Sequence, residues 1–126
     1  MKAGIAVAIV FVLYIAASFL TQGYIDKSAG ELEQKAAQIE EAVASEDWDA
    51  AETGIGELYE QWEDHKTRWL LLEDHDKVDE IDEAIAMARD MIGIQEKPHS
   101  IDAVGRFVFH VNDVPDKGNL ELGNIF

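Results

Sequence analysis

The sequence contains no cysteine, only two prolines, and 10 basic residues against 26 acidic ones. The lack of cysteine excludes disulfides, thiolate nucleophiles and cysteine-ligated zinc or iron–sulfur sites. A formal net charge of −16 disfavours binding to nucleic acid, because such binding depends on neutralising phosphates with Lys and Arg. The sequence also lacks a phosphate-binding glycine loop and the His-Glu-x-x-His pattern of zinc hydrolases. We therefore expect neither a cofactor nor enzymatic activity.

Charge is also missing near the N-terminus, where no charged residue occurs between Lys2 and Asp26. Residues 3–20 form an apolar run. As a helix rising ~1.5 Å per residue, this run is roughly 27 Å long, close to the hydrocarbon thickness of a bilayer. We therefore predict a single transmembrane anchor within residues 1–25, with residues 3–20 in contact with lipid.

The flanks of this run predict its orientation. The positive N-terminus and Lys2 favour the cytoplasmic side of the cell membrane, so the C-terminal part is expected outside. A cleaved secretion signal is the competing interpretation, with small residues at 16–18 as the cleavage region. The run is longer than the ~7–15 apolar residues usual in such signals, which favours a retained anchor.

Residues 26–126 are predicted to form one acidic extracytoplasmic helical domain. Residues 1–20 hold one lysine and no acid, so the remainder carries −17. Apolar residues recur at helical spacings throughout, which predicts an all-α fold: the N-terminal helix followed by an antiparallel bundle of about four helices. The first apolar stripe ends near Ala44, and the bilayer helix could run directly into it.

Polar residues at the expected helix starts suggest caps. Ser28 with Glu31 has the spacing of a capping box. Asp47, Asp76 and Ser100 are expected to cap the next three helices.

The C-terminal segment is predicted to leave the last helix by a turn at residues 115–118. The apolar tail that follows is expected to dock on the bundle through Ile125 and Phe126.

The strongest apolar stripe predicts the core, and it includes a seven-residue repeat at Ile55, Trp62 and Trp69. Gly54 and Gly56 interrupt the same helix, which indicates either close helix packing or local weakness. The predicted core residues are Trp48, Ile55, Leu58, Trp62, Trp69, Leu72, Val78, Ile81 and Ile85.

Two Glu-Asp-His tripeptides, at 63–65 and 73–75, provide the only pattern typical of a metal site. The candidates are His65, His75 and Asp79, because His75 and Asp79 lie one turn apart on a helix. Ten residues along a straight helix rotate the second tripeptide by about 80° from the first, which disfavours a shared site. A solvated acidic face explains the same residues more simply.

The chain resembles a family of small membrane-anchored helical proteins of spore-forming Gram-positive bacteria, known only as a domain of unknown function. The matching features are Asp47-Trp48 at a helix start, Trp62, Trp69, the Leu-Leu-x-Asp-His sequence at 71–75, the acidic and apolar helix over 78–85 and the terminal Gly-Asn-Ile-Phe. The resemblance implies an anchor and an all-helical domain. It implies no activity and no catalytic residues.

The favoured hypothesis is a non-enzymatic, membrane-anchored interaction or scaffolding module of the bacterial envelope with a protein partner. One alternative is a divalent-metal-dependent sensor or enzyme that uses His65, His75 and neighbouring acids. The other is a secreted soluble bundle released by signal cleavage.

Overall fold

The computed structural model describes the backbone of residues 2–125 and the side chains of residues 2–112. It contains four helices: α1 (Lys2–Ala44), α2 (Trp48–Leu72), α3 (His75–Gly93) and α4 (Lys97–Ile125). Over residues 2–125 there is no strand. The prediction of an all-α fold with a long apolar N-terminal helix and a helical bundle is confirmed.

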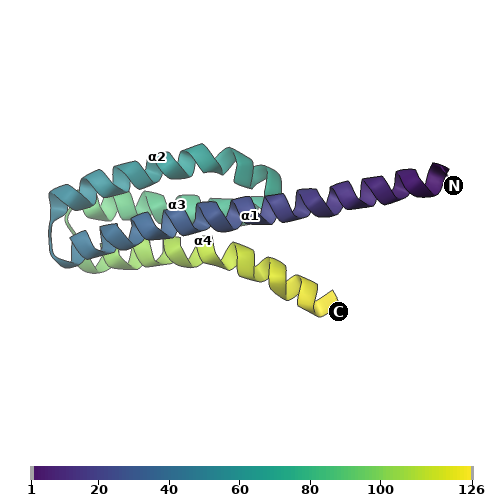
Figure 1. Ribbon diagram of the computed structural model, residues 1–126. Coiled ribbons are helices and arrows are strands. Elements are labelled where there is room, and N and C mark those ends of the chain that lie inside the picture. Colours follow the sequence, from purple (N-terminus) through teal and green to yellow (C-terminus); the bar gives the residue numbers. More distant parts are fainter. Residues whose placement is uncertain (1, 126) are drawn as a thin grey trace.

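The four helices form an antiparallel bundle in which α1 and α3 each pack against α2 and α4. Short connections at residues 45–47, 73–74 and 94–96 allow each helix to fold back on the one before it. Figure 1 shows the N-terminal part of α1 projecting from this bundle with no other helix packed against it. α1 therefore forms both the projecting segment and one of the four helices of the bundle.

The continuity of α1 overturns the predicted capping box at Ser28 and Glu31. Because α1 begins at Lys2, the backbone N–H groups near Ser28 already belong to a helix and need no cap. The Ser28 hydroxyl donates instead to the carbonyl oxygens of Tyr24 (2.8 Å) and Ile25 (3.1 Å). Local sequence matched a helix start, but the helix had begun far upstream.

The start of α2 follows the prediction. Asp47 Oδ1 accepts a hydrogen bond from the Ala50 backbone N–H at 3.3 Å, which confirms Asp47 as the cap. The preceding Glu46 has a φ of 59°, a left-handed conformation that reverses the chain between α1 and α2.

The predicted cap of α3 was wrong by one half-turn. The helix begins at His75, so Asp74 occupies the cap position and Asp76 lies in the first turn. An acid in the first turn still stabilises the positive end of the helix dipole, which explains why Asp76 looked like a helix-start residue.

The predicted cap of α4 was also displaced. Ser100 lies inside α4 and its hydroxyl bonds to the Glu96 carbonyl oxygen. Glu96 acts at this helix start instead, since its Oε2 accepts the backbone N–H of His99 at 2.7 Å. Glu96 thus caps the helix four residues before the predicted position.

The turn predicted at residues 115–118 is absent, because α4 continues to Ile125. Pro115 fixes a φ near that of a helix and removes a single backbone donor, so a helix can pass through it with a bend. Figure 1 shows α4 curving away from the other helices toward its C-terminal end. The side chain of Ile125 and all of Phe126 lie outside the described part, so their docking stays a prediction.

The core contains both central tryptophans. Trp62 and Trp69 are fully buried and meet edge to face, with ring centroids 5.5 Å apart. Other predicted core residues that are buried are Ile55, Leu58, Val78, Ile81 and Ile85. Trp48 is only partly buried, and it packs against the edge of the core cluster.

Leu72 corrects the predicted core list, because 40 % of it is exposed. It is the last residue of α2, and it faces an open groove that Leu20 and Tyr24 of α1 also line.

Candidate functional site

Three hydrogen bonds join α1 to α2 near the point where α1 leaves the bundle, two at Tyr24 and one at Ser28. The hydroxyl of Tyr24 lies 2.6 Å from His65 Nδ1, and Arg68 Nη1 donates to the same hydroxyl at 3.3 Å. The Arg68 guanidinium also lies over the Tyr24 ring, 5.8 Å from its centroid. The hydrogen bond to Tyr24 raises the pKa of Arg68.

The third bond is buried in the core. Trp69 Nε1 donates to Ser28 Oγ at 3.0 Å, while that hydroxyl donates to the backbone of its own helix. A buried indole N–H without an acceptor would cost about 1–3 kcal/mol, so this bond selects one arrangement of α1 against α2. Together the three bonds fix the position of the projecting segment relative to the bundle.

The sequence alone did not reveal these two contacts. Tyr24 and Ser28 are spaced by four residues on α1, and His65 and Trp69 by four on α2. Matching i, i+4 pairs of hydrogen-bonding residues on two amphipathic helices could have suggested the contact. The competing interpretation of Ser28 as a cap concealed it.

The predicted metal residues are placed in different surroundings. His65 lies against Tyr24, with its Nε2 3.9 Å from Glu31 Oε2. His75 and Asp79 are exposed on the first turns of α3. Within the part of the chain whose side chains are described, no group of three or more His, Asp or Glu residues is arranged to hold a metal ion.

Polar side chains between α2 and α3 have structural partners. Asp82 accepts a hydrogen bond from Trp62 Nε1 at 2.6 Å and forms an ion pair of 2.6 Å with Lys66. The hydrogen bond to Asp82 raises the pKa of Lys66. These residues stabilise the contact between the two helices.

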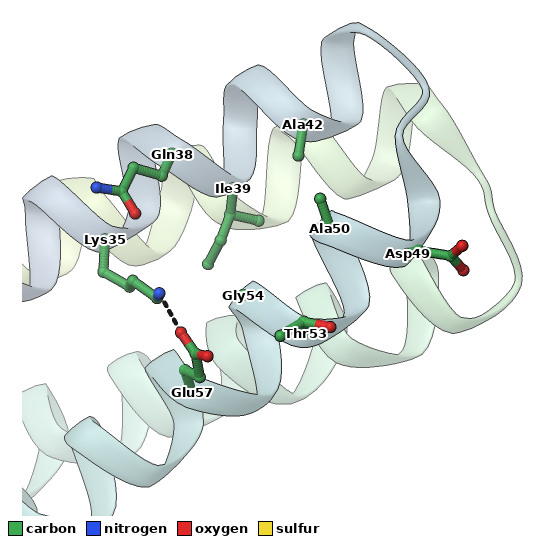
Figure 2. Close-up of a pocket in the computed structure, with 9 residues that line it drawn as sticks. All are labelled: Lys35, Gln38, Ile39, Ala42, Asp49, Ala50, Thr53, Gly54 and Glu57. Carbon is green, nitrogen blue, oxygen red and sulfur yellow. Dashed lines mark hydrogen bonds and ion pairs between the residues drawn. The ribbon is translucent and has the colours of Figure 1, made fainter.

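An open groove of about 420 Å³ lies between α1 and α2 near the 45–47 connection. Figure 2 shows the ion pair of Lys35 with Glu57 crossing it, and Ile39 pointing toward Gly54. The remaining lining residues are Gln38, Ala42, Asp49, Ala50 and Thr53.

The groove also explains one of the two glycines in α2. A Cβ on Gly54 would lie 2.9 Å from Cγ1 of Ile39, whereas a Cβ on Gly56 would meet nothing within 4 Å. Gly54 is therefore required by the close approach of α1 and α2, and Gly56 is not.

Comparison with known families identifies the bundle. The family model "Domain of unknown function (DUF4363)" matches residues 19–125. The chain belongs to this family. The resemblance to an uncharacterised domain family is thus confirmed, and the match includes the polar contacts of α1 with α2 described above. No curated protein and no solved structure matches the chain.

Proposed function

We propose that this DUF4363 protein is a non-enzymatic, single-pass membrane protein whose acidic bundle acts as an interaction or scaffolding module in the bacterial envelope. The observation that carries the proposal is the division of α1. Its most apolar 18-residue window has a mean hydropathy of 2.5 and no buried residue, whereas the second half of the same helix enters the core. An apolar surface on every side of a helix is suited to lipid.

The rigid connection supports a role that depends on orientation. α1 passes from the apolar segment into the bundle without a break, and its contacts with α2 begin at Tyr24. A helix of this kind transmits position and rotation, whereas a flexible linker would provide only proximity. The bundle is thus held in a defined direction relative to the membrane.

The surface of the bundle supports a protein partner. Residues after the anchor carry −17, which favours a cationic partner surface over anionic lipid or nucleic acid. The groove between α1 and α2 combines small side chains with the Lys35–Glu57 pair, so it offers both close approach and charge recognition.

The absence of cysteine makes a topology experiment direct. Ser45→Cys places a single thiol in the exposed 45–47 connection, and Ser18→Cys provides a matched control in the apolar segment. We expect a membrane-impermeant maleimide to label the Ser45→Cys protein on intact cells and to leave Ser18→Cys unlabelled. Labelling of Ser45→Cys only after lysis would reverse the orientation, and its release into the medium would favour the secreted alternative.

Crosslinking in cells tests the interaction role. A photo-reactive residue at Thr53 samples the groove, and one at Glu83 samples the exposed face of α3. We expect Thr53 to give a discrete adduct with one protein and Glu83 to give none. Failure of both positions to crosslink at native expression would contradict the scaffold proposal.

A further inference from the structure

A second set of apolar side chains is exposed at the end of the bundle from which α1 emerges. Leu71 is 82 % exposed and Leu72 is 40 % exposed at the C-terminal end of α2. Leu20, at the end of the apolar run of α1, is 76 % exposed. Figure 1 shows the connection between α2 and α3 lying beside α1 where α1 leaves the other helices.

These side chains share one groove rather than being scattered singly. Leu20, Thr21 and Tyr24 of α1 line it together with Arg68, Leu71 and Leu72 of α2, and its volume is about 340 Å³. The groove joins the end of the apolar segment to the end of α2. Leu20, Leu71 and Leu72 therefore face the same space.

The depth of this groove follows from the length of the helix. If residues 3–20 cross the hydrocarbon, at a rise of ~1.5 Å per residue, Leu20 lies at the hydrocarbon edge and Tyr24 about 6 Å beyond it. Tyr and Arg are well suited to this level, since each combines an apolar body with a polar end that reaches toward headgroups. The contacts of Arg68 with the Tyr24 hydroxyl and ring place both groups there.

We propose that the end of α2, through Leu71 and Leu72, is inserted in the bilayer interface on the bundle's side of the membrane. This second attachment would fix the tilt of the bundle and place the α2–α3 connection at the lipid surface. The inference rests on the proposed membrane span. The ligand is the apolar edge of the bilayer rather than an anionic headgroup, because acidic residues follow at 73, 74 and 76.

The test uses the full chain reconstituted in phosphatidylcholine nanodiscs, with one nitroxide per molecule. Leu71→Cys is the test position, Leu20→Cys reports the span, and Ile94→Cys is the matched control. Ile94 is also an exposed apolar residue, at 68 %, but it follows α3 at the opposite end of that helix from His75. Collision with oxygen, which partitions into lipid, is compared with collision with a water-soluble nickel complex. Labels at exposed positions leave the fold intact, which circular dichroism verifies.

We expect the oxygen-to-nickel ratio at Leu71→Cys to approach that at Leu20→Cys and to exceed that at Ile94→Cys several-fold. The ratio should not change with added salt or anionic lipid, because the contact is apolar. A water-like ratio at Leu71→Cys with a lipid-like ratio at Leu20→Cys would overturn the second attachment and leave the span standing. Protection of Leu71→Cys from both reagents would also overturn it, since the residue would then be covered by protein. A water-like ratio at Leu20→Cys would overturn the span and the inference together.

Discussion

The two halves of α1 have the same backbone conformation and opposite surfaces. Ahead of Thr21, the described side chains are exposed on every face of the helix. In the second half, burial is confined to one stripe, which consists of Ile25, Ser28, Ala29, Leu32, Ala36, Ile39 and Val43. The comparison shows that helix continuity does not mark where the packed bundle begins. The distribution of apolar side chains around the axis does.

Two serines make the comparison specific. Ser18 and Ser28 each donate a hydrogen bond to the carbonyl four residues earlier, at 2.9 Å and 2.8 Å. Only Ser28 also accepts a bond from another helix, through Trp69. The same local hydrogen bond therefore belongs to a contact between two helices at Ser28, whereas at Ser18 it stays within one helix.

Replacing Trp69 by Ala should have the largest effect and should separate the two halves. We expect the bundle to lose about 3–5 kcal/mol of unfolding free energy, because a fully buried indole leaves a cavity and the Ser28 hydroxyl loses its donor. The first half of α1 should stay helical in detergent micelles, since lipid-like solvent alone stabilises it. Denaturant titration followed by circular dichroism measures both. Trp48→Ala, at a partly buried site, is the control and should cost less; an equal loss would contradict the argument.

Matched serine variants should give the next largest effect. Ser28→Ala leaves the Trp69 N–H buried without its acceptor, and we expect a loss of about 1–3 kcal/mol. Ser18→Ala makes the same chemical change in the other half of α1 and should leave bundle stability unchanged. The difference between the two variants, measured by chemical unfolding in the same detergent, isolates the bond between helices. Equal stabilities would mean that the Ser28–Trp69 bond contributes nothing.

Alanine at the two α2 glycines should change stability in opposite directions. Gly54→Ala places a Cβ 2.9 Å from Ile39, so overpacking should outweigh the helix-propensity gain and give a net loss of about 1 kcal/mol. Gly56→Ala meets open space and should stabilise the bundle by up to ~1 kcal/mol. Thermal unfolding of the pair measures the contact between α2 and the bundle half of α1. A stabilising Gly54→Ala would show that the helices can move apart without cost.

The smallest effect concerns the start of α4 and its pH dependence. The hydrogen bond between the side chains lowers the pKa of Glu96 and raises the pKa of His99. The Glu96 contribution is present above its ordinary pKa of 4.5 and is lost as the pH falls through the lowered value. The His99 contribution is complete below 6.5 and is lost as the pH rises through the raised value.

The pair should therefore stabilise α4 most between these two ordinary values. His99→Ala should lower the melting temperature slightly near about pH 5.5 and have less effect near about pH 8. Comparing the variant with the wild type at each pH removes the contribution of the other carboxylates. Adding Glu96→Gln should abolish the difference, and a His99→Ala effect that grows with pH would contradict the assignment.

The sequence by itself determined the apolar segment, the four helices and most of the core. These features depend on the spacing of apolar residues and on composition, which can be read without knowing which segments lie nearby. The apolar stripe through Ile55, Trp62 and Trp69 must be buried whichever helix packs against it. The Asp47 cap was predictable because its bond to Ala50 spans only three residues.

Only the tertiary structure decided what individual residues do within these helices. Ser28 resembled a cap until the continuous α1 and Trp69 supplied its partners, and Leu72 matched the stripe but faces an open groove at the end of α2. Gly54 and Gly56 are alike in sequence, and only the approach of Ile39 distinguishes them. His65 is held by a tyrosine 41 residues away rather than by the acids beside it. The physical reason is the same in each case. Burial, close approach and hydrogen bonding each depend on two chain segments that are distant in sequence, and a local sequence pattern describes only one of those segments.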